Sequence, residues 1–119
     1  MERIGIIDLG SNTARLLLVD VYEDGYFHLV DQLKESPRLG EGMEKDGFLK
    51  PARIQETIRT LKLFRKLCDV NGISRIIAVA TAAVRRAKNQ RSFLDAGRPW
   101  PPRRQRPSRG QARSSWSTR

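Results

Sequence analysis

Cysteine, histidine and long apolar runs are scarce in this sequence, and each shortage excludes a class of protein. The single cysteine, Cys68, cannot form an internal disulfide and excludes a zinc site made of cysteines alone. The single histidine, His28, has no second histidine as a co-ligand, so we expect a solvent-facing or hydrogen-bonded side chain rather than a metal ligand. No run approaches the roughly 18 apolar residues of a membrane helix, and the N-terminus lacks a signal-peptide pattern. We therefore expect a cytoplasmic protein without membrane contact.

Acidic and aliphatic residues are missing from the last part of the chain. Residues 1–95 hold 16 of the 23 Lys and Arg residues and all 13 acidic residues, whereas residues 96–119 hold seven Arg and no Ile, Leu, Val, Phe or Met. Such a segment cannot form a core, so we expect a disordered basic tail. The composition favours a shifted reading frame, because GC-rich DNA read out of frame encodes Arg, Pro, Ser and Gly. The alternative is a genuine arm that binds nucleic acid weakly through Arg and Trp.

Residues 1–95 have the length of one modest domain, and their apolar pattern predicts an α/β fold. Three strands form a meander in which Phe27, Leu29 and Leu33 share one face of the third strand. A helix, a fourth strand and further helical pieces follow, with Cys68 as a small buried residue of the main helix. The right-handed crossover rule places the fourth strand parallel to the first. The expected strands cover residues 3–8, 14–21, 26–35 and 75–80, and the expected helices cover residues 51–70, 81–85 and 89–95.

The clearest candidate binding residues lie where the first strand ends. Asp8 leaves the strand, and the turn after it contains Gly10, Ser11, Asn12 and Thr13. Gly10 can adopt positive φ, and the amides that follow can form a concave nest for phosphate oxygens. A carboxylate beside bare phosphate would repel it, so Asp8 predicts a bridging cation, Mg²⁺ with retained waters. The alternative is an ordinary hairpin turn without a ligand.

Two further segments supply candidate phosphate ligands. Thr81 and Arg85 follow the fourth strand, and parallel neighbouring strands end at the same edge of a sheet. We therefore expect both side chains to face the pocket of the turn after Asp8, Arg85 through a bidentate contact with phosphate. Arg38 is the likeliest ligand-facing group of the Gly-rich segment 36–47, which we expect to be an irregular loop; the alternative is a solvated side chain.

Four segments together resemble a known family. The first three are residues 7–13 (IDLGSNT) with the strand that follows, residues 38–43 (RLGEGM) and residues 76–81 (IIAVAT). The fourth is residues 83–94, which begins with AVR at 83–85 and contains Asn89 and Phe93-Leu94. The sequence is similar to the N-terminal part of the exopolyphosphatase / guanosine pentaphosphate phosphohydrolase family, within the actin-like, sugar-kinase and Hsp70 ATPase superfamily. The resemblance covers residues 1 to about 95.

The resemblance implies a partial ribonuclease-H-like lobe and Mg²⁺-assisted hydrolysis of the terminal phosphoanhydride of polyphosphate or guanosine pentaphosphate. In that family, the residues matching Asp8, Gly10, Ser11 and Asn12 form the first phosphate loop, and the one matching Arg85 binds phosphate. The family's catalytic Glu and second lobe have no counterpart here, so no catalytic residue is assignable and we expect the chain alone to be inactive. The runner-up function is a noncatalytic fragment that binds phosphate, or nucleic acid through its tail. The fourth strand is expected to be an open edge that favours self-association.

Overall fold

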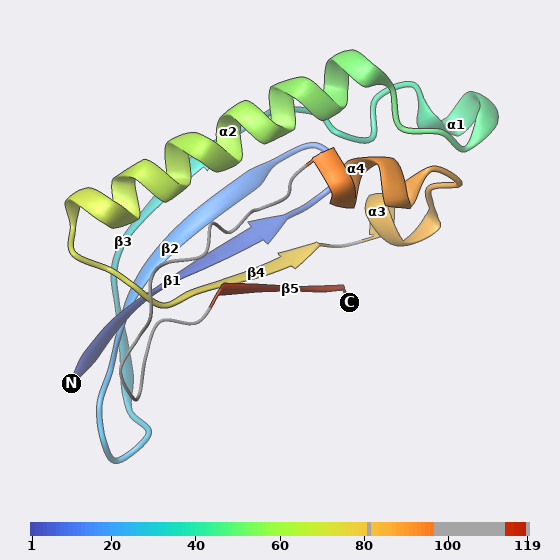
Figure 1. Cartoon of the computed structure of the whole chain (residues 1–119). Coiled ribbons are helices and arrows are strands. Elements are labelled where there is room, and N and C mark those ends of the chain that lie inside the picture. The colour runs from blue at the N-terminus through green and yellow to red at the C-terminus, as the bar shows by residue number, and fades with distance from the viewer. Residues whose placement is uncertain (81, 97–113, 119) are drawn as a thin grey trace.

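The computed structural model describes residues 1–80, 82–96 and 114–118, which form one sheet with helices on one face and at one end (Figure 1). Apart from the short helix α1, the order of strands and helices predicted from the sequence is confirmed for residues 1–80 and 82–96. In chain order, the elements are β1 (Glu2–Leu9), β2 (Ala14–Val21), β3 (Phe27–Glu35), α1 (Met43–Asp46), α2 (Pro51–Val70), β4 (Ile76–Ala80), α3 (Ala82–Arg86), α4 (Gln90–Ala96) and β5 (Ser114–Thr118).

The strands are arranged in the order β3-β2-β1-β4-β5. β1 and β2 are antiparallel, as are β2 and β3, while β4 runs parallel to β1 with Gly5 opposite Ile76 and Leu9 opposite Ala80. The predicted meander and the parallel β4 are therefore confirmed. Because β1 and β4 run the same way, the turn after β1 and the segment after β4 leave the sheet at the same end (Figure 1).

The long helix α2 covers one face of the sheet. Pro51 stands at its first turn, where a missing N–H costs nothing, and Asn71 and Gly72 end it, Gly72 with φ 72°. Cys68 is fully buried on this helix, and burial raises the pKa of its thiol to about 11. A Cβ on Gly5 of β1 would lie 2.9 Å from the Cys68 sulfur, so glycine permits the close approach of helix and sheet.

Strand β3 differs from its predicted pattern. The pairing with β2 shifts register between Leu18 and Val19, which face Asp31 and Leu29, so that Val30 is an extra residue. Because a bulge reverses the alternation, Phe27 and Leu29 lie on the opposite face from Leu33. The prediction that these three residues share one face is wrong. Phe27 is 68% exposed and Leu29 47% exposed, while Leu33 packs against the core.

The tail and the loop before α2 also differ from expectation. Residues 114–118 form β5, which pairs in parallel with β4, so the prediction of an open β4 edge is wrong along these five residues. Disorder of the tail stays a prediction. Backbone N–H and C=O groups can pair along an edge whatever the side chains are. Residues 97–113 lie outside the described part, and self-association stays a prediction. The segment predicted to be an irregular loop contains the short helix α1, between Gly42 (φ 86°) and Gly47 (φ 81°).

None of the helices within residues 1–80 and 82–96 combines the length and apolar character needed to cross a bilayer. The cytoplasmic location stays a prediction.

Candidate functional site: the turn after β1

The turn after β1 is a tight hairpin connection to β2. The N–H of Gly10 donates to the carbonyl of Thr13 at 2.8 Å. Gly10 does not have the positive φ that its sequence position suggested; among the described residues, positive φ is found at Arg38 and at four other glycines. The segment therefore forms the hairpin turn that the sequence offered as an alternative. A hairpin turn and phosphate binding are compatible, because the same turn presents backbone N–H groups.

The carbonyl groups of this turn bind a segment that is distant in the sequence. The N–H of Gly40 donates to the carbonyl of Ser11 at 2.8 Å, and the N–H of Arg38 donates to the carbonyl of Asn12 at 3.0 Å. Within the described residues, the N–H groups of Ser11 and Asn12 donate no hydrogen bond. Ser11 is half-buried and Asn12 is exposed, so the turn presents unpaired donors at its surface.

Gly40 allows three segments to meet. A Cβ at this position would lie 3.3 Å from the Ser11 Cβ, 3.4 Å from the Ser11 carbonyl oxygen and 3.5 Å from the Ala83 Cβ. Ala83 belongs to α3, which follows β4. A residue without a side chain therefore lets the turn after β1, the loop after β3 and α3 pack together at one end of the sheet.

Arg38 has an unusual backbone conformation and an exposed side chain. Its φ of 54° places it in the left-handed region, which costs a non-glycine residue about 1 kcal/mol. The two hydrogen bonds that hold it run from its own N–H to Asn12 and from the Glu41 N–H to its carbonyl, both at 3.0 Å. Its side chain is 62% exposed, with one guanidinium nitrogen 3.7 Å from Glu41. The structure thus places the Arg38 backbone directly beside the turn, and a ligand-facing role of its side chain stays a prediction.

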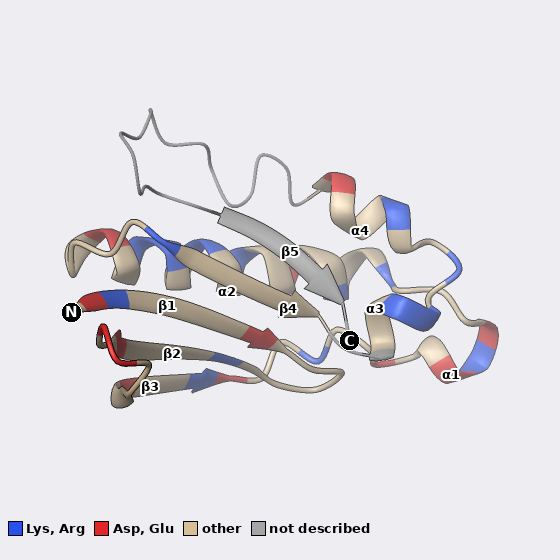
Figure 2. Cartoon of the chain, turned by 90° about the horizontal axis from the view of Figure 1, so that it is seen from below, with Lys and Arg blue, Asp and Glu red and all other residues tan. Residues whose placement is uncertain are grey.

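Arg85 lies on α3, at the same end of the sheet. Its side chain is exposed, and its guanidinium makes no ion pair with a described residue. Viewed from below, α3 shows a basic segment close to the charged helix α1 (Figure 2). Arg85 thus lies on the element whose Ala83 packs close to Gly40. A pocket shared by Arg85 and the turn stays a prediction. Thr81, the other residue predicted after β4, lies outside the described residues.

Asn89 fixes the connection between α3 and α4. Its side-chain amide donates to the carbonyl of Leu49 at 2.9 Å, and its side-chain oxygen accepts from the Leu49 N–H at 2.8 Å. A third bond joins the Lys88 N–H to the carbonyl of Gly47 at 2.9 Å. These contacts attach the segment that carries Arg85 to the loop before α2, 40 residues earlier in the chain.

Asp8 is the residue that could hold a metal at this site. It is half-buried near the end of β1, where it pairs with Arg15 of β2 and Val79 of β4 in the ladder. The described residues contain no group of three or more His, Cys, Asp or Glu side chains that could hold a metal on their own. A single carboxylate would fit Mg²⁺ together with a phosphate ligand, because Mg²⁺ is usually bound through one or two carboxylates, waters and the phosphates of the ligand.

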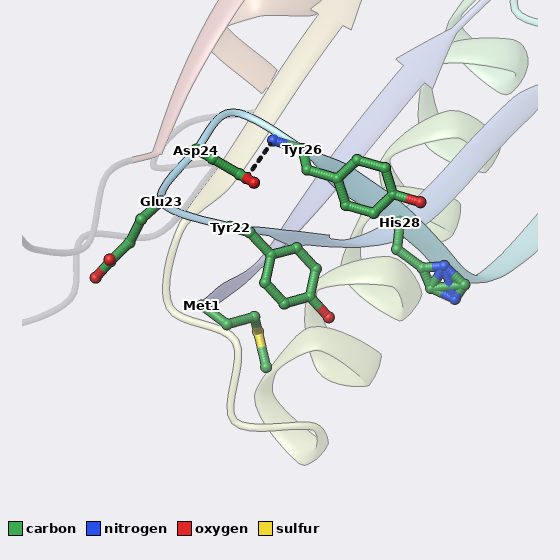
Figure 3. A pocket seen from close by; sticks show the side chains of 6 residues that line it. All are labelled: Met1, Tyr22, Glu23, Asp24, Tyr26 and His28. Atoms are coloured by element: carbon green, nitrogen blue, oxygen red, sulfur yellow. Dashed lines mark hydrogen bonds between the residues drawn. The ribbon is translucent and has the colours of Figure 1, made fainter.

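A cavity of about 720 Å³ lies at the other end of the sheet, beside the β2–β3 hairpin (Figure 3). None of the residues predicted for the phosphate site belongs to it. The Tyr22 and Tyr26 rings are tilted by 42° to each other with centroids 6.0 Å apart, and Asp24 accepts a hydrogen bond from the Tyr26 N–H at 3.0 Å. The lining residues are Met1, Tyr22, Glu23, Asp24, Tyr26 and His28.

Sequence reasoning missed the roles of Gly40 and Asn89. Both lie in segments that the sequence analysis had compared with the family, but neither was given a function. A glycine can be recognised in a sequence, while the neighbours that require it become known only in the fold. Asn89 forms two hydrogen bonds with a backbone 40 residues away, and no local pattern signals this contact.

Comparisons with known proteins agree with this geometry. The model of the Ppx/GppA phosphatase family matches residues 18–98. The chain is 34% identical over 92 residues to exopolyphosphatase 1 of Mycobacterium tuberculosis, an alignment that covers 77% of this chain and 27% of the relative. It is 35% identical over 94 residues to a bifunctional 3-dehydroquinate synthase/phosphatase of Fusobacterium nucleatum, covering 74% of this chain and 14% of that protein.

Solved structures give the same result. A Ppx/GppA family member from Aquifex aeolicus superimposes with a TM-score of 0.72 and 38% identity, covering 79% of this chain and 30% of the other. An exopolyphosphatase from Cytophaga hutchinsonii gives a TM-score of 0.75 and 34% identity, covering 82% and 31%. The chain thus spans about a third or less of the length of these relatives. The family match, the identities and the shared fold show that this chain belongs to the Ppx/GppA phosphatase family.

Proposed function

We propose that residues 1–95 form the first phosphate-binding part of a phosphohydrolase that cleaves the terminal phosphoanhydride of polyphosphate or guanosine pentaphosphate. The observation that supports this most is the turn after β1. Its carbonyl groups bind the loop after β3, while the N–H groups of Ser11 and Asn12 donate to no described residue. Membership of a phosphatase family supports the class of reaction.

Each residue of the proposed site has a role that follows from its chemistry. The N–H groups of Ser11 and Asn12 donate to phosphate oxygens, and the Ser11 hydroxyl adds a neutral donor. Arg38 and Arg85 neutralise phosphate charge, which is most of what phosphoryl transfer requires from a protein. Asp8 would hold Mg²⁺ through coordinated waters, and Mg²⁺ when bound supplies charge neutralisation and orientation of the transferred group.

Gly10 and Thr13 complete the turn through the bond between the Gly10 N–H and the Thr13 carbonyl. Thr81, which lies outside the described residues, is proposed as a further hydroxyl ligand. No residue of this chain is proposed as the general base, so we expect the chain alone to bind phosphates with little turnover. Binding of nucleic acid by residues 96–119 stays a prediction, since most of that segment is outside the described part.

The test compares Asp8→Ala with Asp31→Ala, which removes an exposed carboxylate of β3. Isothermal titration calorimetry would measure tripolyphosphate binding with and without Mg²⁺. We expect Mg²⁺-dependent binding that Asp8→Ala weakens by about tenfold, in the range for loss of a group that supports a metal site, and that Asp31→Ala leaves unchanged. Binding that depends on neither Mg²⁺ nor Asp8 would contradict the metal site.

A second measurement addresses catalysis and substrate. Phosphate release from polyphosphate and from guanosine pentaphosphate would be followed with Mg²⁺, with the Asp8→Ala protein as the control. Any release that belongs to this site must fall in Asp8→Ala, because the carboxylate would no longer hold the metal. Release that the substitution leaves unchanged would remove the catalytic part of the proposal.

A further inference from the structure

Glu41 lies between two guanidinium groups next to the turn after β1. Its Oε2 is 3.7 Å from Nη1 of Arg38, and its Oε1 is 3.7 Å from Nε of Arg53, a residue in the first turn of α2. Each carboxylate oxygen therefore faces a different arginine. The sequence analysis assigned no role to Glu41 or to Arg53.

The contacts of Glu41 are longer than hydrogen bonds. A guanidinium bound to a carboxylate or a phosphate normally has N–O distances of about 2.7–2.9 Å. The Glu41 side chain is also 55% exposed, so water screens both of its ion pairs. A carboxylate held in this way can be replaced by an anion that reaches both arginines at hydrogen-bond distance.

Arg53 also holds the loop that carries Arg38. Its Nη1 donates to the carbonyl of Pro37 at 3.0 Å, and its side chain is 28% exposed. Pro37 directly precedes Arg38, whose N–H is bound to Asn12 of the turn. Arg53 is thus connected to the turn after β1 through the peptide group between Pro37 and Arg38. Its Nη1 binds the Pro37 carbonyl, and its Nε faces Glu41.

We propose that Arg38 and Arg53 form a two-arginine anion site beside the turn, that Glu41 occupies this site in the ligand-free protein, and that a phosphoryl group displaces Glu41 when it binds. This inference rests on the proposed function in taking phosphate as the ligand. Glu41 then acts as an internal competitor, which lowers affinity for phosphate and favours ligands with enough charge to displace a carboxylate, such as chains of several phosphates.

The experiment measures tripolyphosphate and inorganic phosphate binding to the full chain by calorimetry at low ionic strength. Glu41→Gln should tighten tripolyphosphate binding roughly threefold, because two exposed ion pairs no longer compete with the ligand. Glu56→Gln is the matched control, since it removes one carboxylate from an ion pair with Arg59 on α2. It should leave binding unchanged. The gain in Glu41→Gln should shrink as salt is added.

Arg53→Gln tests the second arginine. It should weaken tripolyphosphate binding roughly threefold, and the Glu41→Gln/Arg53→Gln double variant should lose most of the gain seen for Glu41→Gln alone. Arg53→Lys keeps the charge and serves as a second variant in case loss of the bond to Pro37 disturbs the loop. A gain in affinity in Glu41→Gln cannot result from misfolding, so this variant is the deciding one.

The outcomes separate this inference from the proposed function. If the wild-type chain binds tripolyphosphate and neither Glu41→Gln nor Arg53→Gln changes the affinity, the two-arginine site is wrong and the phosphate turn stands. If both variants behave as expected but Asp8→Ala and Mg²⁺ have no effect, the two-arginine site stands and the metal-dependent function fails. If neither wild type nor Glu41→Gln binds either phosphate, both proposals are overturned.

Discussion

The two ends of the sheet are held together in different ways. Where β1 and β4 end, the turn after β1 is joined to the loop after β3 by two backbone hydrogen bonds, and α3 packs against both at Gly40. At the opposite end, the β2–β3 hairpin is closed by bonds within itself, between Tyr22 and Tyr26 and between Tyr22 and Gly25. Figure 1 shows α1, α3 and α4 gathered at the first end, and the hairpin, the N-terminus and the connection from α2 to β4 at the second.

This difference indicates which end of the sheet holds its loops in more fixed positions. Contacts between distant segments restrict a site more than contacts within one turn, because moving one segment then requires moving the others. The end with many long-range contacts is the end that carries Ser11, Asn12, Arg38 and Arg85. The other end carries an open cavity lined in part by Tyr22 and Tyr26. It is held by the hairpin and by ion pairs at the strand ends, Arg3 with Asp20 and Arg75 with Glu2.

The largest expected effect is that of Gly40→Val. The new side chain would meet the Ser11 carbonyl and the Ala83 side chain, neither of which can move without displacing its segment. We expect a loss of about 3 kcal/mol in the free energy of unfolding, as for overpacked cores, together with loss of tripolyphosphate binding. Urea denaturation and calorimetry measure the two effects.

Gly25→Ala at the other end is the matched control. No described residue lies within 4 Å of the position that a Cβ would take, but the φ of 89° disfavours alanine, so we expect a loss of about 1 kcal/mol in the free energy of unfolding and unchanged binding. Equal effects of the two substitutions on phosphate binding would show that the contrast between the two ends has no functional meaning.

Asn89→Ala should have the next largest effect. It leaves the N–H and carbonyl of Leu49, a residue 1% exposed, without their partner, for an expected loss of about 2 kcal/mol. Asp24→Ala removes an exposed side-chain bond to a backbone N–H in the hairpin and should cost about 0.5 kcal/mol.

Asn89→Asp keeps the acceptor and loses the donor, so its stability should lie between those of wild type and Asn89→Ala. Thermal denaturation of the four proteins makes the comparison. A larger loss for Asp24→Ala than for Asn89→Ala would reverse the proposed order of the two ends.

The smallest effect concerns pH, and it compares one carboxylate from each end. A hydrogen bond from Arg3 lowers the pKa of Asp20 below its ordinary 3.8, and a hydrogen bond from Lys50 lowers the pKa of Asp46 in the same way. Each pair therefore stabilises the fold above about pH 4, and this contribution is lost as the pH falls through the lowered pKa.

Denaturation by urea between pH 6 and pH 3 measures this loss. The Asp20 side chain is 8% exposed and the Asp46 side chain 51%, so Asp20→Asn should flatten the pH dependence more than Asp46→Asn. A larger flattening in Asp46→Asn than in Asp20→Asn would mean that solvent screening does not decide the strength of these ion pairs.

Much of the candidate site could be predicted because its signals are local. The turn from Gly10 to Thr13 follows from a strand that runs into small polar residues, and the placement of Arg85 follows from the parallel pairing of β1 and β4. The third strand was misread where periodicity fails: Val30 looks like any other strand residue, and only pairing with β2 reveals it as a bulge. The left-handed φ of Arg38 is equally invisible, since arginine rarely adopts it.

The sequence by itself determined the order of the strands and the longer helices, the start of the main helix at Pro51 and its end before Asn71 and Gly72, the family, and the tight turn after β1. These features depend on hydrophobic period, turn residues and short motifs, which act over a few neighbouring residues. Only the tertiary structure decided that Arg38 lies against Asn12, that Gly40 joins three segments and that Glu41 lies between two arginines. Such contacts depend on how remote backbones pack, because each is chosen by the position of a partner that the local sequence does not specify.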